Sequence, residues 1–211
     1  MLLKRKENKM DKRKSLLLVI GSLLIFISIF LFSFNYYNSY KDDLKEQKNL
    51  DDFYQEQEEI KEIIKDNKED IEKVKVDSNY IAVLKIDKIN LEKGLYEIGN
   101  SLNNVDHNIE ILSGSNMPDV ENGNLVLSSH NGYLKESYFR NLYKVEIHDK
   151  ISVFYDSYEY IYEVINTYKV EKTGTVKVIR NNNKNTLTLI TCSGDNEQLV
   201  VICELADKKL I

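Results

Sequence analysis

The chain has 211 residues, of which 42% are hydrophobic and 30% charged, and its net charge is −5. The single proline and eight glycines exclude a collagen-like or low-complexity chain, and the length suits one ordinary domain with accessory segments. The charge is uneven, because residues 1–14 hold seven basic and two acidic side chains, which leaves the remainder at −10. This acidic body argues against a nucleic-acid partner.

The first predicted element is a membrane-spanning helix over residues 15–35. Residues 16–34 carry no charge, and nineteen helical residues extend about 28 Å, which is close to the thickness of the hydrocarbon core of a bilayer. The apolar stretch is too long for a cleaved signal peptide and no small-x-small cleavage motif follows it, so we interpret it as a retained anchor. The basic tail, residues 1–14, predicts a cytoplasmic N-terminus and an extracytoplasmic remainder.

A helical stalk is predicted over residues 36–76. This segment is rich in Lys, Glu, Asp and Gln and contains no Pro or Gly, a composition that favours helix. Its apolar residues recur at a 3-4 spacing with interruptions at Gln57 and Asn67, and they are Phe53, Ile60, Ile64, Ile71 and Val74. The pattern fits a solvated spacer helix, a helix that packs on its own domain, or one that pairs weakly.

Short β-rich runs occupy the chain from Tyr80 onward. Asn, Asp and Gly separate the runs, which are residues 81–86, 94–98, 124–129, 150–155, 160–172, 186–191 and 199–205. Seven or eight short strands within about 130 residues indicate a mainly β domain, a closed barrel or a sandwich, over residues 77–211. Short helices are predicted between the strands at 101–111 and 135–142.

Two predicted strand ends carry side chains suited to nucleophilic catalysis. Cys192 ends the alternating run Thr-Leu-Thr-Leu-Ile-Thr-Cys and precedes the turn-like sequence Ser-Gly-Asp-Asn. His130 ends the run Asn-Leu-Val-Leu-Ser-Ser-His and precedes Asn-Gly. A thiol and an imidazole form a nucleophile and its base when the fold brings them together. His107 and His148 lack such a context, and the histidines and cysteines lack metal-ligand spacing, so no metal site is predicted.

The second cysteine is interpreted as a core residue. Cys203 lies inside the apolar run 199–205, whereas Cys192 lies at the end of its own run. If the two runs are adjacent antiparallel strands joined by a short turn, the two Cα atoms lie further apart than a disulfide allows. Cys203 is therefore expected to be a small buried hydrophobe with a free thiol.

These motifs resemble those of the sortases, membrane-anchored cysteine transpeptidases of Gram-positive bacteria, of class D-like or class B-like type. Thr-Leu-Ile-Thr-Cys192 matches the TLxTC signature, and Leu-Ser-Ser-His130 matches the strand with the catalytic histidine, within a likeness over residues 80–205. The resemblance implies an eight-stranded β-barrel that needs no cofactor and cleaves LPxTG-like sorting signals through a thioacyl intermediate at Cys192. An amine of a cell-wall precursor or a pilin would resolve the intermediate. His130 would transfer the protons, and Ser129 and Thr191 are candidates for substrate contact.

One position departs from the family pattern. Sortases carry an arginine at the start of the strand after the cysteine turn, and the matching residue in this chain is Gln198. A neutral amide donates to an oxyanion with roughly half the strength of a charged group. Gln198 could act more weakly, Arg180 or Arg140 could reach the site, or the protein could be a catalytically impaired module that binds peptides or scaffolds a surface complex. An enzyme that only hydrolyses is a further alternative.

Overall fold

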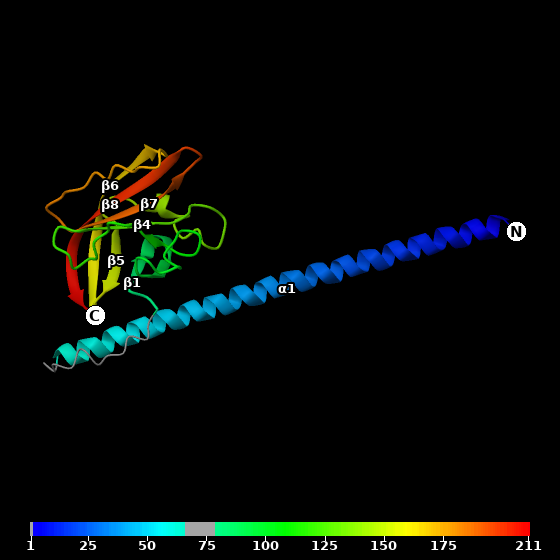
Figure 1. Cartoon of the computed structure of the whole chain (residues 1–211), viewed down its shortest axis with the longest axis horizontal. Coiled ribbons are helices and arrows are strands. Elements are labelled where there is room, and N and C mark those ends of the chain that lie inside the picture. The colour runs from blue at the N-terminus through cyan, green and yellow to red at the C-terminus, as the bar shows by residue number, and fades with distance from the viewer. Residues whose placement is uncertain (1, 66–78) are drawn as a thin grey trace. The chain divides into compact units, whose positions relative to one another are not determined.

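The computed structural model describes residues 2–65 and 79–211, with side chains for 14–62 and 79–211. The chain forms two compact units, Met1–Lys48 and Asn49–Ile211. A single helix, α1 (Leu2–Lys65), makes up the first unit and extends into the second (Figure 1). The predicted stalk therefore begins as helix, while its residues 66–76, with Ile71 and Val74, lie outside the described part of the chain.

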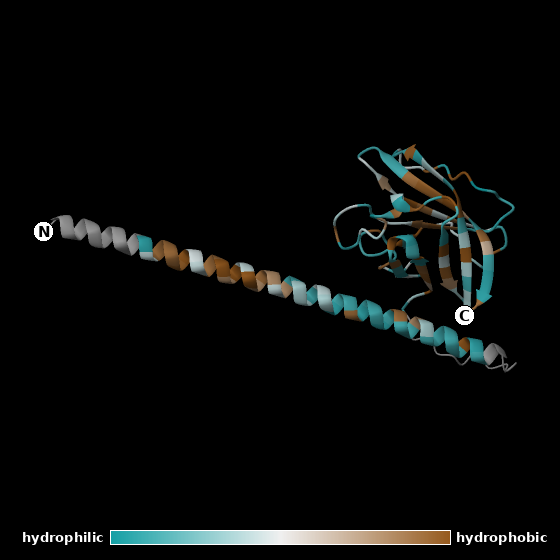
Figure 2. Cartoon of the chain, turned by 180° about the vertical axis from the view of Figure 1, so that it is seen from behind, coloured by the Kyte–Doolittle hydropathy of each residue, from teal (hydrophilic) through white to brown (hydrophobic). Residues whose placement is uncertain are grey.

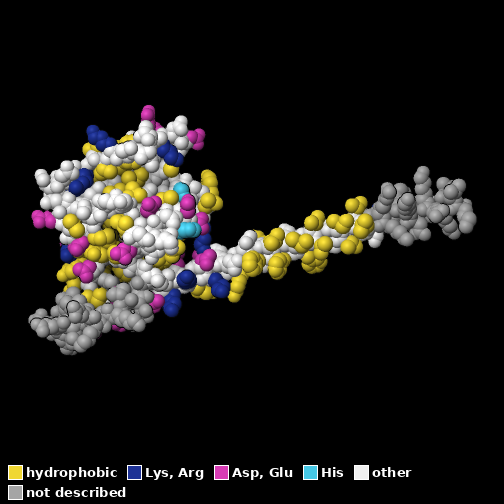
Figure 3. All heavy atoms as spheres, viewed as in Figure 1, with side chains coloured by type: hydrophobic (Ala, Val, Ile, Leu, Met, Phe, Trp, Pro, Cys, Tyr) yellow, Lys and Arg dark blue, Asp and Glu magenta, His cyan; other side chains and the backbone are white. Residues whose placement is uncertain are grey.

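The first unit contains the predicted membrane anchor. Within Lys14–Glu62, α1 includes one stretch that is long and apolar enough to cross a membrane, and none of that stretch is buried against protein. This part of the helix is coloured as hydrophobic in Figure 2, and Figure 3 shows hydrophobic side chains along it. For example, Leu18 is 75% exposed and Phe26 is 72% exposed. A helix that is apolar on all sides and uncovered by protein has the surface that a bilayer requires.

The second unit is a nearly closed eight-stranded barrel, as the family resemblance implied. Its strands are β1 (Ala82–Ile86), β2 (Leu91–Leu95), β3 (Glu110–Ile111), β4 (Asn124–Ser128), β5 (Lys150–Tyr155), β6 (Tyr158–Glu171), β7 (Thr186–Ser193) and β8 (Glu197–Leu210). They are ordered β2-β1-β5-β6-β8-β7-β4-β3 in the sheet. Among the described strands, β4 and β7 form the one parallel pair. Two short 3₁₀ helices, η2 (Asp87–Ile89) and η3 (Leu142–Lys144), lie in the connections.

The sheet around β7 is covered on both faces. Leu187 and Leu189 point into the barrel core together with Val201 and Cys203 of β8. On the outer face, Ile190 packs in a second cluster, whose other members are Val200, Ile202, Leu112, Val126, Tyr168, Val170, Val176 and Val178. Cys203 is fully buried with a free thiol, as predicted, and its burial raises the pKa of that thiol.

The last turns of α1 belong to the barrel unit. Phe53 is 1% exposed and packs with Leu50, Tyr80 and Val83 in a cluster of its own. The side chain of Gln57 accepts a hydrogen bond from the backbone N–H of Ser157, in the turn between β5 and β6. Of the alternatives for the stalk, this portion packs on its own domain, and the compact unit begins at Asn49 where the sequence had suggested residue 77.

The two predicted helices at 101–111 and 135–142 are wrong. Residues 101–109 form turns, in which Asn104 Oδ1 accepts a hydrogen bond from the Asp106 backbone N–H, and Asn103 exchanges two with the backbone of Ile111. These asparagine side chains satisfy the backbone groups that a helix would otherwise bond. Residues 135–141 are turns as well, and the predicted strand 94–98 is displaced to β2, Leu91–Leu95.

Candidate active site

The register of β4 and β7 brings Cys192 and His130 to neighbouring positions. Ser128 pairs with Ile190 in this parallel ladder, and His130 and Cys192 each follow two residues later. After the end of β4 the chain still lies beside β7: the Asn131 side-chain amide donates a hydrogen bond of 2.8 Å to the Cys192 carbonyl. Parallel strands end at the same edge of a sheet, so the thiol and the imidazole leave the barrel at one place.

Gln198 lies on β8, directly opposite Cys192 on β7. Cys192 and Gln198 are Cα partners in the antiparallel β7–β8 ladder, and Gln198 is in turn the partner of Val170 on β6. Side chains of paired residues project from the same face of a sheet. Cys192, Gln198 and Val170 therefore share the outer face, and Cys192 is a free, partly exposed cysteine.

His130 has an acidic partner that the sequence did not reveal. Its Nε2 lies 3.2 Å from Oδ1 of Asp106, with the two side chains 43% and 82% exposed. Asp106 belongs to the turns before β3, and the Asn104 side chain holds its backbone N–H. The contact joins residues 24 positions apart. No motif spacing signals such a pair, because an irregular loop positions the carboxylate.

The two predicted substrate contacts are buried. Thr191 is 2% exposed and its hydroxyl donates a hydrogen bond of 2.7 Å to the Ser129 carbonyl. Ser129 is 3% exposed, and its backbone N–H donates to the Ile190 carbonyl. Both residues thus tie the end of β4 to the end of β7. The structure places them beneath the thiol and the imidazole, where they are not accessible to a peptide.

The two alternative arginines are held by backbone carbonyls in different parts of the barrel. The Arg180 guanidinium donates to the carbonyls of Asn122 and Lys184 and to the Thr186 hydroxyl, at the beginning of β7. From Thr186 to Cys192, a strand extends about 20 Å, so Arg180 stabilises the opposite end of the ladder. Arg140 donates to the carbonyls of Gly132 and Leu134 and holds the loop after His130.

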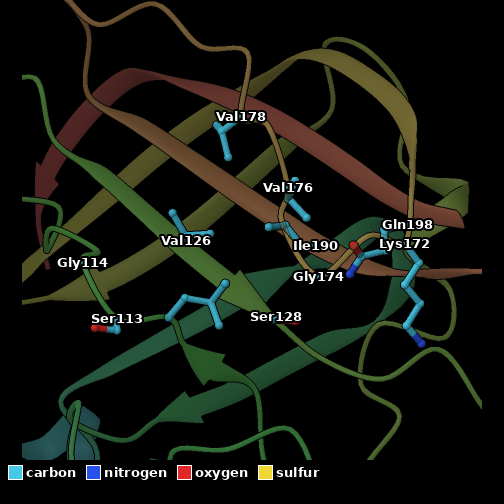
Figure 4. A pocket seen from close by; sticks show the side chains of 11 residues that line it. Ser113, Gly114, Val126, Ser128, Lys172, Gly174, Val176, Val178, Ile190 and Gln198 are labelled. Carbon is cyan, nitrogen blue, oxygen red and sulfur yellow. The ribbon is translucent and has the colours of Figure 1, made fainter.

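A pocket of about 410 Å³ lies on the same outer face. Its walls come from β4, β7, β8 and the segments around 112–114 and 172–178, and its lining consists of Leu112, Ser113, Gly114, Val126, Ser128, Lys172, Gly174, Val176, Val178, Ile190 and Gln198. Lys172 and Gln198 lie together at one end of it, with Val126 and Ile190 between them and Ser113 (Figure 4). Sequence reasoning found only Gln198 of this set, because the others meet through strand register and loop packing.

The barrel thus carries a partly exposed thiol and an imidazole at adjoining strand ends, the two groups that a nucleophile and its base require. The family model described as Sortase domain matches residues 84–206, more than half of the chain. The chain therefore belongs to the sortase family.

Individual relatives agree with this assignment. Sortase D of Bacillus subtilis (strain 168) is 31% identical over 110 residues, which are 52% of this chain and 52% of that protein, so the match spans about half the length of this relative. A lid mutant of sortase A from Corynebacterium diphtheriae is 27% identical, with a TM-score of 0.54 over 60% of this chain and 70% of that chain. Sortase C of Streptococcus pneumoniae shares the fold at 22% identity, with a TM-score of 0.56 over 63% and 72% of the two chains.

Proposed function

We propose that this protein cleaves an LPxTG-like C-terminal sorting signal of surface proteins and transfers the cleaved protein to an amine of the cell wall. The observation that carries the proposal is the β4–β7 register, which sets His130 and Cys192 each two residues beyond the pair of Ser128 and Ile190. A nucleophile needs its base within reach, and this arrangement supplies both from rigid strands.

In the first half-reaction, the Cys192 thiolate attacks the carbonyl carbon that precedes the scissile bond. The carbon–sulfur bond forms and the carbonyl π electrons move to oxygen, which gives a tetrahedral oxyanion. As the oxyanion collapses, the C–N bond breaks and the protonated His130 gives its proton to the leaving amine. In the second half-reaction, the incoming amine attacks the thioester and neutral His130 takes its proton; the C–S bond then breaks and releases the Cys192 thiolate, with His130 protonated again.

Asp106 supports this role of His130. When Nε2–H of the imidazole donates to the carboxylate 3.2 Å away, Nδ1 is the nitrogen left for proton transfer. The carboxylate thereby favours one orientation and one tautomer of the ring.

The pocket is suited to the residues that precede the scissile bond. Val126, Val176 and Ile190 offer an apolar surface on the outer face of the sheet. An apolar side chain and a proline in the sorting signal would bury their surface there, which favours binding by about 25 cal/mol per Å².

The anchor completes the proposal. Residues 15–35 would hold the protein in the cell membrane as a single span, with the basic tail in the cytoplasm and the barrel on the outer side, where sorting signals and cell-wall precursors are found.

One observation favours a second candidate, a sortase-like module that binds peptides without cleaving them. Gln198 stands opposite the thiol where the family has an arginine. A binder has no use for a partly exposed thiol beside an imidazole, so we rank the transpeptidase first.

The test uses the full-length chain in detergent micelles, beside its Cys192→Ala and His130→Ala variants. Each is incubated with a library of LPxTG-like peptides and short amines, and the products are followed by mass spectrometry. Cleavage at one bond, with amine ligation that requires Cys192, supports the transpeptidase. A product of hydrolysis alone supports a thiol protease, and a folded chain that binds peptides without any thioacyl adduct supports the binding module.

A further inference from the structure

Four strands present a row of polar side chains across the outer face of the sheet. The strand order β6-β8-β7-β4 places Gln198 and Cys192 on adjacent strands, with His130 following β4 on the far side of the thiol. On the near side, Val170 of β6 is the partner of Gln198. Lys172 comes two residues after Val170, so the alternation of a strand places both on the outer face.

Lys172 is held at this position by the backbone. Its N–H donates a hydrogen bond of 2.8 Å to the carbonyl of Asn196, in the turn that joins β7 to β8. The pairing of β6 with β8 therefore extends one residue past Glu171. The side chain of Lys172 lines the pocket at the end where Gln198 lies (Figure 4).

The ammonium group of Lys172 has no carboxylate partner among the described residues, whereas Lys169, on the neighbouring part of β6, does. Lys169 forms an ion pair of 3.2 Å with Glu197. The chain is acidic overall. Against that background, an exposed lysine that has no carboxylate partner and lies near the proposed nucleophile offers its positive charge to a ligand.

We propose that Lys172 supplies the positive charge that stabilises the oxyanion formed at Cys192. This inference rests on the proposed function. As the Cys192 sulfur bonds to the carbonyl carbon, the electron pair moves to the carbonyl oxygen. Gln198, on the neighbouring strand β8, donates an N–H to that oxygen. The Lys172 ammonium adds the positive charge that the amide lacks. Hydrogen bonds from a charged donor are roughly twice as strong as those from a neutral one.

The distances across the sheet permit this contact. Two strand spacings and an offset of two residues separate the Cα atoms of Lys172 and Cys192 by about 12 Å. The flexible four-carbon stem of lysine extends from one side, and the cysteine side chain with its bound acyl group extends from the other. Arg180, in contrast, donates to backbone carbonyls at the opposite end of β7, and the Arg140 guanidinium is occupied by the carbonyls of Gly132 and Leu134.

The first test measures charge at the thiol without any peptide. The full-length chain in detergent is alkylated at Cys192 with iodoacetate, an anion, and with iodoacetamide, its neutral analogue. We expect Lys172→Gln to lower the iodoacetate-to-iodoacetamide rate ratio about fivefold, because a cation near the thiol concentrates the anionic reagent. Lys172→Arg should retain the ratio. The matched control is Lys169→Gln, on the same strand and the other face, which should not change it.

The second test measures turnover of a sorting peptide without carboxylate side chains. We expect Lys172→Gln to lower kcat about tenfold with little change in KM, and Gln198→Arg in that background to restore it, because a guanidinium returns opposite the thiol. Three outcomes would overturn the role of Lys172. They are an alkylation ratio that Lys172→Gln leaves unchanged, an equal effect of Lys169→Gln, and a loss of turnover that occurs only with acidic peptides. A wild-type chain that forms no thioacyl adduct, with the ratio still dependent on Lys172, would instead show that the proposed function is at fault.

Discussion

Replacing Asp106 with asparagine tests how much the carboxylate contributes to the action of His130. The pair is exposed, with the Asp106 side chain 82% and the His130 side chain 43% accessible, and its atoms are 3.2 Å apart. Exposed ion pairs are worth about 0.2–1 kcal/mol, because water screens the charges and competes for the hydrogen bond. Since 1.36 kcal/mol corresponds to a factor of ten, kcat/KM should fall by no more than about fivefold.

This magnitude separates two mechanisms. A buried carboxylate that fixes a catalytic histidine can contribute about four orders of magnitude in rate, whereas the exposed Asp106 can only bias the ring toward one orientation. The assay is steady-state cleavage of a sorting peptide by the full-length chain, with Glu110→Gln as a control for loss of a nearby negative charge. A loss of a hundredfold or more in Asp106→Asn, without loss in the control, would refute the reasoning from exposure.

Four further predictions concern the packing and the thiols. Phe53→Ala should lower the unfolding free energy of the barrel by about 3–5 kcal/mol in denaturant titrations, because it empties a fully buried site; Glu58→Ala, on the exposed side of α1, should change it by less than about 0.5 kcal/mol. Arg180→Ala should lower stability, while the Cys192 alkylation rate stays as in the wild type; a selective loss of Cys192 reactivity would place Arg180 at the thiol after all. In the native protein, iodoacetamide should modify Cys192 and not Cys203, and peptide mapping that finds both modified would contradict the burial of Cys203. Because burial raises the pKa of the Cys203 thiol, the unfolded chain releases this proton near pH 9 while the folded chain retains it. Stability should therefore decline above about pH 9, and less steeply in Cys203→Ala; equal slopes would show that Cys203 does not contribute.

The sequence predicts the parts of this structure that depend on local pattern. The alternation of β7 and the apolar run of β8 are visible because each strand has one face in the barrel core. The thiol and imidazole could be recognised because a strand pattern stops at each. The 101–111 segment was misjudged because its asparagine side chains bond the backbone, and composition alone does not show whether such residues cap a helix or replace it.

The rest of the site depends on pairings between distant segments. Lys172 could not be distinguished from any other surface lysine until the β6–β8 register placed it beyond Val170 on the face of the thiol. The sequence makes Thr191 and Ser129 candidates for substrate contact, and each directly precedes one of the two catalytic candidates. Their side chains point the other way, since neighbouring residues on an extended chain face opposite sides.

The outer cluster around Ile190 has a consequence for how this protein can change. Val126, Val176, Val178 and Ile190 line the pocket and also belong to the cluster that covers β7. Under the proposed function, a substitution that reshapes the pocket for another peptide thus also alters the packing over the strand that ends in Cys192. A change of peptide preference should then reduce the rigidity of that strand end. Variants selected for altered recognition should need compensating changes at Val200 or Ile202, which support the cluster from β8 without lining the pocket.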